Sequence, residues 1–311
     1  MPIWLIVLII SLSAFVVTLI IWFFINGTIF FNVTFRRREG DLDFAKNEDP
    51  RAKKAPDRIW FFDQKFEELT LVSYDKLNLK GYFLNNNSNK LAILVHGYHG
   101  RYYSVVSQAR IFYENGFDVL CINNRCHDTS EGKSFSMGKK EARDVLDWIN
   151  KMLERNPNYQ IALYGISMGA HIAMRAATDK KLNPNVKCVI EDCGYSHLRK
   201  QLHYIMSSRN YFAGKLIVNV AELYTKLIYH FSYGHPIEKR VKNLRIPILM
   251  FHGGKDDYVP TENINKISKS IPENIYQEKY VFEKSGHTAC VIDNKEKYKQ
   301  ILNDFVNRFI K

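Results

Sequence analysis

The stretch at residues 161–177 constrains the fold of this 311-residue chain more than any other. An apolar, strand-like run leads into Gly165-Ile-Ser167-Met-Gly169, and an alanine-rich, helix-compatible run follows. The pattern predicts a strand, a tight turn and a helix, with Ser167 at the apex. Glycine on both sides of the serine removes the Cβ atoms that would clash where the strand and the helix come close. A serine on such a turn holds its oxygen clear of the backbone.

The surrounding sequence alternates between strand and helix patterns. An alternating pattern at 68–73 and 77–86 predicts a β-hairpin. Apolar runs predict strands at 91–95, 118–123, 188–192, 246–251 and 278–282, and helical patterns occupy 103–114, 139–153, 262–270 and 295–310. Strands that alternate with helices predict an α/β fold, with a mostly parallel sheet covered by helices on both faces.

The segment at about 195–243 interrupts this alternation, and within it residues 212–231 could form a helix. Insertions of this length in compact domains are usually functional lids or disordered segments. The segment is rich in Tyr, Leu, Ile and His, which argues against disorder. We therefore expect a helical cap over a pocket, and membrane contact is a second possibility.

The N-terminal residues 3–25 carry no charged side chain. A helix needs about 20 apolar residues to cross a bilayer. The run is too long for a typical signal-peptide core, and it lacks a basic start and an A-x-A-like cleavage site. We expect residues 1–35 to form an uncleaved transmembrane anchor, with Trp4 and Trp22 near the two interfaces.

Charge sets the expected orientation. No side-chain charge precedes the span, whereas seven basic residues follow it: Arg36, Arg37, Arg38, Lys46, Arg51, Lys53 and Lys54. The positive-inside tendency then places the C-terminal domain in the cytoplasm, with the chain in the cell membrane as a single-pass protein. Residues 36–58 are polar and contain two prolines, so they are predicted to be a linker to a domain at 59–311.

The net charge and the cysteines indicate which kinds of partner and which compartment to expect. The net charge of +12 is compatible with nucleic acid or with an anionic membrane. The basic residues are scattered and form no nucleic-acid motif, which favours the membrane. Five cysteines without zinc or C-x-x-C spacing indicate unpaired thiols in a reducing compartment. We expect no metal and no cofactor.

Two further residues complete a candidate site with Ser167. A serine hydroxyl needs a base to take its proton and a third group to orient that base. Asp256 follows 89 residues after Ser167, and His287 follows 31 residues after Asp256. Each lies in a loop directly after a predicted strand, where the ligand sites of parallel sheets gather. The order serine, acid, histidine is that of sheet-based hydrolases, with His287 as base and Asp256 as its partner.

Four motifs give the chain its resemblance to a known superfamily: His96-Gly-Tyr-His-Gly100, Gly165-Ile-Ser-Met-Gly169, His252-Gly-Gly-Lys-Asp256 with Val259-Pro260, and Gly286-His287. With these, residues of about 66–308 resemble the α/β-hydrolase superfamily, especially bacterial membrane-associated serine hydrolases and, more distantly, the eukaryotic ABHD-type depalmitoylase-like enzymes. The resemblance implies that the backbone N–H groups of Tyr98 and Met168 form an oxyanion hole. Relatives often carry Arg-Gly-His-Gly-x-Ser where this chain has Arg125-Cys-His-Asp-Thr-Ser130.

Several other residues could fill these roles. Asp257 adjoins the predicted acid, and Asp192 ends another strand. His96 and His252 precede glycines at strand ends and are expected to hold turns. His127 and Asp128 could form a catalytic dyad, although they lie in a loop before the serine. His171 lies four residues after Ser167 and is expected to be a core or supporting histidine.

The sequence thus predicts a membrane-anchored serine hydrolase that cleaves acyl esters, with a small or lipid-like acyl ester as substrate. A serine peptidase or an acyl-protein thioesterase could use the same three residues, because function depends on the pocket rather than on the fold. A membrane-bound binding protein without catalysis is the alternative from another class. The oligomeric state stays open.

Overall fold

The computed structural model describes residues 1–36 and 56–311. The predicted linker at 36–58 therefore lies mostly outside the described residues. The chain forms two compact units. One contains Met1–Arg36 and Arg199–Gly234, and the other contains the described residues of Arg37–Leu198 together with His235–Lys311.

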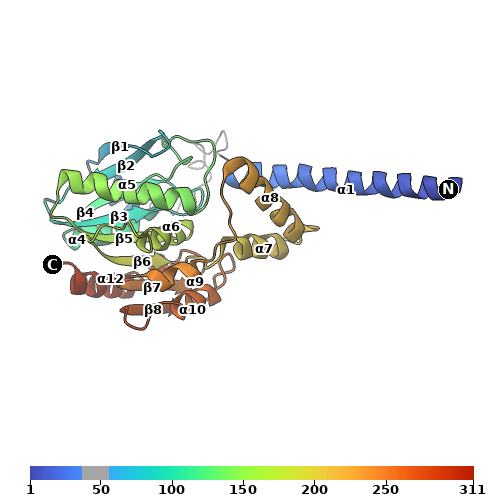
Figure 1. The fold of residues 1–311 in the computed structure, drawn as a ribbon. Coiled ribbons are helices and arrows are strands. Elements are labelled where there is room, and N and C mark those ends of the chain that lie inside the picture. Colours follow the sequence, from blue (N-terminus) through green and yellow to red (C-terminus); the bar gives the residue numbers. More distant parts are fainter. Residues whose placement is uncertain (37–55) are drawn as a thin grey trace. The chain divides into compact units, whose positions relative to one another are not determined.

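The larger unit is built on an eight-stranded sheet with the order β1-β2-β4-β3-β5-β6-β7-β8 (Figure 1). The strands are β1 (Glu67–Val72), β2 (Asn78–Leu84), β3 (Lys90–Val95), β4 (Asp118–Ile122), β5 (Gln160–Ile166), β6 (Val186–Asp192), β7 (Ile248–Gly253) and β8 (Gln277–Phe282). β1 pairs with β2, and β2 with β4, in antiparallel fashion, and all other pairs are parallel. The predicted hairpin and the mostly parallel sheet are both confirmed.

Helices connect these strands. They are α3 (Pro56–Phe62), α4 (Val106–Glu114), α5 (Lys139–Arg155), α6 (Met168–Ala177), α9 (Ile237–Arg240), α10 (Glu262–Ser268), α11 (Cys290–Asp293) and α12 (Lys295–Phe309), with short 3-10 turns η2 (Tyr102–Val105) and η3 (Val241–Asn243). α3 begins inside the predicted linker. Proline suits its first turn, because the N–H that proline lacks would have no helical acceptor there.

Both faces of the sheet are buried, which explains why its strands are continuous apolar runs. On one face, α4 and α12 share a core cluster with alternate strand residues such as Val119 and Cys121. On the other face, α5 and α6 pack together, and Trp148 of α5 lies over Gly81 beside Leu120. The sheet is therefore a rigid support whose carboxyl edge is free to present loops.

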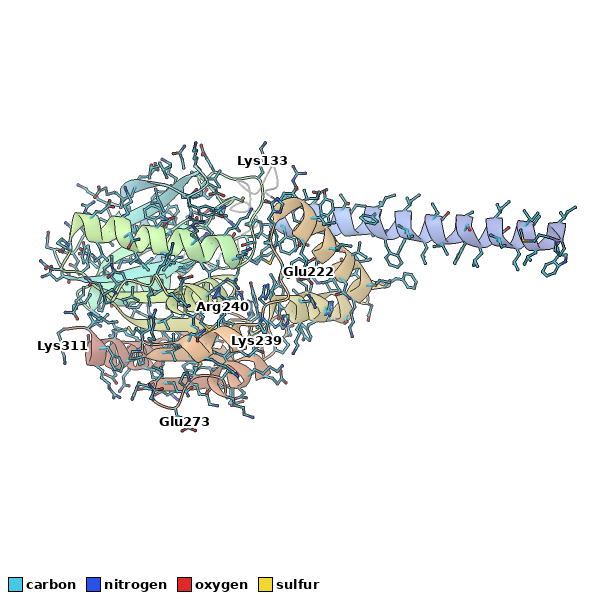
Figure 2. All side chains as sticks on the ribbon, viewed as in Figure 1. Lys133, Glu222, Lys239, Arg240, Glu273 and Lys311 are labelled. Carbon is cyan, nitrogen blue, oxygen red and sulfur yellow. The ribbon has the colours of Figure 1, made fainter. Side chains whose placement is uncertain are left out.

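The smaller unit consists of α1 (Ile3–Phe35), most of α7 (Leu198–Ser208) and α8 (Gly214–Tyr229). α8 confirms the helix predicted at 212–231, whereas α7 was not predicted as a separate helix. α1 is long and apolar enough to cross a membrane: its 18-residue window has a mean hydropathy of 2.9 and is 0% buried. Its side chains project outward along its length in Figure 2. The predicted division into anchor, linker, domain and cap stays a proposal.

Candidate active site

The turn between β5 and α6 has the strained geometry expected of the glycine–serine pattern. Ser167 has a φ of +56° and caps the N-terminus of α6. A Cβ on Gly165 would lie 2.1 Å from the carbonyl oxygen of Gly169, and a Cβ on Gly169 would lie 2.0 Å from that of Val95. No side chain fits at such distances, so both glycines are required for the backbone to turn here. The strain is typical of functional sites.

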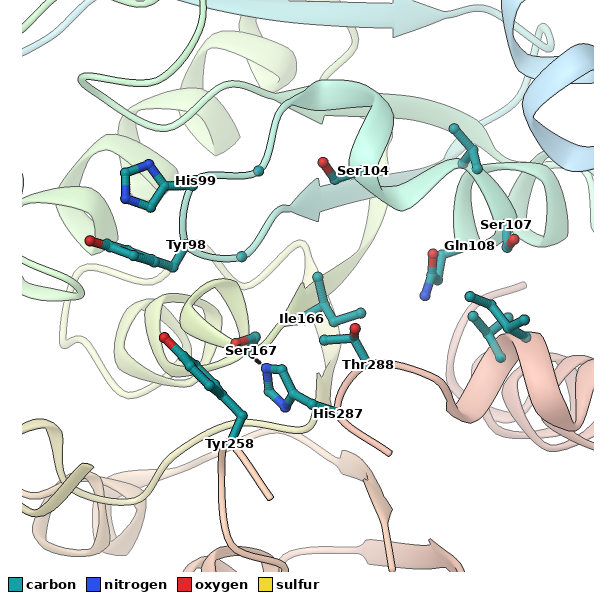
Figure 3. Close-up of a pocket in the computed structure, with 15 residues that line it drawn as sticks. Tyr98, His99, Ser104, Ser107, Gln108, Ile166, Ser167, Tyr258, His287 and Thr288 are labelled. Carbon is teal, nitrogen blue, oxygen red and sulfur yellow. Dashed lines mark hydrogen bonds between the residues drawn. The ribbon is translucent and has the colours of Figure 1, made fainter. Parts of the chain in front are cut away.

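His287, in the loop after β8, faces this serine. Its Nε2 lies 2.9 Å from Ser167 Oγ. Figure 3 shows the two side chains pointing toward each other, with Tyr258 beside the imidazole. The Tyr258 and His287 ring centroids are 5.1 Å apart. The hydroxyl can therefore donate its proton to an unprotonated Nε2.

The other ring nitrogen of His287 bonds to Asp256, in the loop after β7. Nδ1 donates to Asp256 Oδ2 over 2.7 Å, while Oδ1 accepts the backbone N–H groups of Tyr258 and Val259 at 3.0 and 2.7 Å. Burial alone would raise the pKa of Asp256, but hydrogen bonds from His252 and His287 outweigh it and lower the pKa below its usual value. An ionised Asp256 fixes the tautomer in which Nδ1 carries the proton.

A second histidine supports the same carboxylate. His252, on β7, is fully buried. Its Nε2 donates to the carbonyl oxygen of Val259 at 2.9 Å and lies 3.4 Å from Asp256 Oδ2. Burial lowers the pKa of His252, but its interactions, first the hydrogen bond with Asp256, outweigh burial and raise it. The sequence predicted that His252 holds a turn, but it gave no sign of the contact with Asp256.

The two predicted oxyanion donors flank Ser167 on different elements. Met168 is the first residue of α6, so its N–H has no acceptor within the helix, and it lies at the positive end of the helix dipole. Tyr98 follows Gly97, where an added Cβ would lie 3.3 Å from Ser167 Cβ. His96 holds this loop, because it donates from Nδ1 to the carbonyl of Gly97 and accepts the N–H of Asn124. The oxyanion role of Tyr98 and Met168 stays a prediction.

A pocket of about 470 Å³ opens over Ser167. Part of its wall is apolar, with Val106, Ile166, Val291 and Ile292, and part is polar but uncharged, with Ser104, Ser107, Gln108 and Thr288. Among the described residues that line it there is no aspartate, glutamate, lysine or arginine. Gln108 and Thr288 are visible beyond the serine in Figure 3.

Several known proteins are similar to this chain in sequence or in fold. The family described as serine aminopeptidase, S33, matches residues 86–220. The uncharacterised protein YqkD of Bacillus subtilis (strain 168) is 23% identical over 287 residues, which are 88% of this chain and 90% of that protein. The uncharacterised membrane protein YNL320W of Saccharomyces cerevisiae is 22% identical over 246 residues, which are 78% of this chain and 79% of that protein.

Among solved structures, the Pyrococcus furiosus esterase Pf2001 superposes with a TM-score of 0.68 at 20% identity, over 83% of this chain and 95% of that chain. The chain is an α/β-hydrolase by fold. The predicted resemblance to this superfamily is confirmed. The matches support a hydrolase of the esterase and peptidase type, and they do not choose between those two activities.

The structure also locates the alternative site residues. Asp256, and not Asp192, bonds to His287. Asp192 accepts hydrogen bonds from Tyr164 and Tyr298, and Asp257 is exposed.

The alternative histidines His171 and His127 form hydrogen bonds with backbone carbonyl groups. His171 donates to the carbonyl of Tyr195, and burial lowers its pKa to about 3, so it is a neutral core residue, as expected. His127 donates to the carbonyl of Arg125. Arg125 itself pairs with Asp75 and Asp144, and so ties the β1–β2 hairpin to α5 where this chain departs from the common loop motif.

Two groups of side chains in the described part of the chain have the spacing of metal ligands. In the first, of Asp192, Cys193 and Cys290, the carboxylate already accepts hydrogen bonds from two tyrosine hydroxyls. The second is nearer to the serine. Ligand atoms of Cys193, Asp256 and His287 lie within 4.8 Å of one another. Asp256 and His287 already bond to each other at 2.7 Å, so a cation here would have to break that hydrogen bond. The donor set thus fits the proton-transfer chain better than a metal, and the expectation of no metal stays a prediction.

Proposed function

We propose that this protein is a membrane-anchored serine hydrolase that cleaves acyl esters through Ser167, His287 and Asp256. The observation that carries the proposal is the continuous hydrogen-bonded chain of 2.9 Å from Ser167 Oγ to His287 Nε2 and 2.7 Å from His287 Nδ1 to Asp256 Oδ2. Such a chain activates a hydroxyl that is otherwise a poor nucleophile.

In the proposed reaction, Ser167 Oγ attacks the ester carbonyl carbon while His287 Nε2 takes the hydroxyl proton. The negative charge that develops on the carbonyl oxygen is held by the N–H groups of Tyr98 and Met168, each worth about 3 kcal/mol in other enzymes. Collapse of this intermediate breaks the bond to the alcohol, which receives the proton from His287. A water molecule then attacks the acyl-enzyme and gives a proton to His287. Collapse of this second intermediate breaks the bond from the acyl carbon to Ser167 Oγ, which takes the proton back from His287, and the carboxylic acid is released. Asp256 stabilises the imidazolium at each stage.

The pocket supports an acyl substrate. Val106, Ile166, Val291 and Ile292 offer apolar surface beside Ser167, which suits an aliphatic acyl chain. A serine peptidase is the second candidate, because the matching family is described as serine aminopeptidase. An aminopeptidase must bind a positively charged α-amino group, and the described residues lining this pocket include no carboxylate to pair with it. The lining therefore favours the ester.

The anchor part of the proposal is supported by α1. An exposed helix of mean hydropathy 2.9 is unfavourable in water and suits a hydrocarbon environment. The basic residues that follow it favour a cytoplasmic position for the catalytic domain. We therefore propose a single-pass protein of the cell membrane with the membrane as its partner.

The first experiment measures the mass of the full chain in detergent after reaction with a fluorophosphonate, for the parent and for Ser167→Ala. We expect one adduct on the parent and none on the variant, because only an activated serine reacts. Ser104 also lines the pocket and lies away from His287 in Figure 3, so Ser104→Ala is the matched control and should be labelled like the parent. A parent that is folded and unlabelled would leave the non-catalytic binding protein as the better account.

A second experiment compares esters of increasing acyl length with aminoacyl amides of similar size. We expect ester hydrolysis to exceed amide hydrolysis, and kcat/KM to rise with acyl length until the pocket is filled. Preference for substrates with a free α-amino group would instead support the aminopeptidase. Equal rates for all acyl lengths would remove the role given to the apolar wall.

A further inference from the structure

The helix α8 has three distinct faces. One face is buried within its own unit and carries Gly214, Ile217, Val218, Ala221 and Thr225. A second face is polar and carries Lys215, Asn219, Glu222 and Lys226. The third face is apolar but exposed: Leu216 is 47%, Leu223 48% and Leu227 62% exposed. A helix of a water-soluble protein normally has only the first two.

Three side chains of the polar face have partners within this unit. Glu222 is buried and pairs with Arg199 of α7 and with Lys226 of its own helix. Asn219 accepts a hydrogen bond from His203 of α7. α7 therefore packs against the buried and polar faces of α8, and the described residues of this unit leave the three leucines uncovered.

The leucine face lies next to α1. Leu216, Leu223 and Leu227 share a stripe with Val220, at spacings of three and four residues. Val220 packs against α1 at Gly27, where an added Cβ would lie 2.8 Å from Val220 Cγ1. The leucines thus border the line along which the two helices touch.

Aromatic contacts continue this line in both directions. Near the start of α8, Phe212 packs against Trp22 with ring centroids 6.3 Å apart. Near its end, Tyr224 and Tyr229 pack against Phe31, with centroids at 5.4 and 4.2 Å. α8 therefore runs beside the C-terminal part of α1, roughly from residue 22 to residue 31.

The apolar surface of α1 does not stop where α8 begins. Ile25, Ile29 and Val33 are 54%, 55% and 47% exposed, and the first charged residue after them is Arg36. At a rise of about 1.5 Å per residue, α1 is about 50 Å long, whereas the hydrocarbon core of a bilayer is about 30 Å thick. A hydrocarbon core that begins near Ile3 ends after about 20 residues of α1, so residues 22–31 and the leucine face beside them lie at the interfacial level of the bilayer.

From this geometry we propose that the leucine face of α8 (Leu216, Leu223 and Leu227) lies in the interfacial region of the bilayer that α1 enters. An amphipathic helix of this kind buries its apolar side among acyl chains and keeps its charged side at the headgroups. Lys215 and Lys226, on the polar face, are then placed to meet anionic phospholipids. The inference rests on the anchor part of the proposed function and does not depend on the catalytic part.

The test uses the full chain, one copy per nanodisc of phosphatidylcholine and phosphatidylglycerol, so that a second copy cannot cover the helix. Leu223→Cys is compared with Lys226→Cys, because the two residues are almost equally exposed in the structure. Leu223 is 48% exposed, and the side chain of Lys226 is 49% exposed. All five native cysteines are buried, and the parent chain gives their background. The rate of reaction with a water-soluble maleimide is measured for each variant.

We expect Leu223→Cys to react on the order of tenfold more slowly than Lys226→Cys, because acyl chains exclude the reagent. Equal rates would overturn the inference. A third variant, Val16→Cys in the exposed part of α1, tests the membrane anchor separately from the position of α8. Slow reaction at Val16 with equal rates on α8 would overturn only the α8 inference, whereas fast reaction at Val16 would overturn the anchor itself.

Another part of the protein, rather than lipid, could also shield position 223 from the maleimide. A second measurement therefore distinguishes between protein and lipid. A fluorophore attached to the Leu223→Cys variant should be quenched by lipids that carry a nitroxide on the acyl chain, and a fluorophore on Lys226→Cys should be quenched less. Slow maleimide reaction without quenching at position 223 would mean that another part of the chain covers the face, and it would overturn the lipid assignment.

Discussion

The ends of two neighbouring strands, β6 and β7, each present a buried aspartate, and the two carboxylates have opposite surroundings. Asp256, just beyond β7, accepts hydrogen bonds from His287 and from two backbone N–H groups, and its pKa is lowered. Asp192, the last residue of β6, accepts hydrogen bonds from the hydroxyls of Tyr164 and Tyr298, each at 2.8 Å. Burial raises the pKa of Asp192, and these hydrogen bonds do not overcome it.

The two aspartates are similarly buried, at 7% and 0% exposure, so burial does not explain the difference. The donors explain it. A histidine that can become positively charged favours an ionised carboxylate, whereas a neutral hydroxyl compensates only part of the cost of burying the charge. The hydrogen-bond donors around each aspartate therefore matter more than the strand end on which the aspartate lies. They decide whether the carboxylate can support proton transfer or only forms buried hydrogen bonds within the core.

The largest expected effect is that of Asp256→Asn. The amide oxygen would keep the hydrogen bonds from the N–H groups of Tyr258 and Val259, so the NH2 group would face His287 and donate to Nδ1. The proton of His287 would then sit on Nε2, which is the wrong tautomer, and the neutral amide would not stabilise an imidazolium. We expect kcat on an ester substrate to fall by about 10⁴-fold while the chain stays folded. Steady-state kinetics and circular dichroism of the same preparation measure both quantities. Activity within tenfold of the parent would show that Asp256 is not the orienting acid.

Asp192→Asn is the matched control for this variant. The backbone carbonyl of Asp192 accepts the N–H of Ser167 at 2.7 Å and is unchanged by the substitution. Tyr164 and Tyr298 both donate to Oδ2, and the Cys193 thiol donates to Oδ1. The NH2 of an asparagine would therefore face either both hydroxyls or the thiol, which costs about 1–3 kcal/mol of stability. We expect kcat to stay within tenfold of the parent and the melting temperature to fall. A loss of kcat equal to that of Asp256→Asn would contradict the division of roles.

The positions of Asp256 and Ser167 in loops at strand ends follow from local sequence pattern, and their catalytic roles stay a prediction. A glycine–serine–glycine turn after an apolar strand has few backbone solutions, and the structure places Ser167 at a φ of +56°. The loops after β7 and β8 meet at one edge because parallel strands end at the same edge. The surroundings of Asp192 were not predictable in this way, since Tyr164 and Tyr298 are distant from it in sequence.

In the smaller unit, too, contacts between residues that are distant in sequence could not be predicted. The uncharged run covers residues 3–25, and the anchor is predicted to extend to residue 35, where α1 ends. The sequence does not predict that α8 packs against Gly27 and Phe31 of this helix. The pairing of Glu222 with Arg199, which joins α8 to α7, also depends on tertiary structure.

A smaller effect is expected at Glu191, beside Asp192 on β6. Its side chain is fully buried; Oε2 accepts the N–H of Gly194, and Oε1 has no hydrogen-bond partner among the described residues. Burial raises the pKa of Glu191 to about 8, although His252 opposes the shift. An unfolded glutamate ionises near pH 4.3, so between about pH 4.3 and 8 the folded chain keeps a proton that the unfolded chain has lost.

The free energy of unfolding should therefore decrease as the pH rises through this window, and Glu191→Gln, which cannot ionise, should remove that dependence. We expect the variant to be more stable than the parent by about 1–3 kcal/mol at pH 8 and nearly equal to it at pH 5. Thermal unfolding in detergent at pH 5, 6.5 and 8 measures the difference, with Glu262→Gln as an exposed control that should follow the parent. A Glu191→Gln variant that is less stable at every pH would mean that the ionised carboxylate is stabilised in the fold, and Glu191 would then resemble Asp256 rather than Asp192.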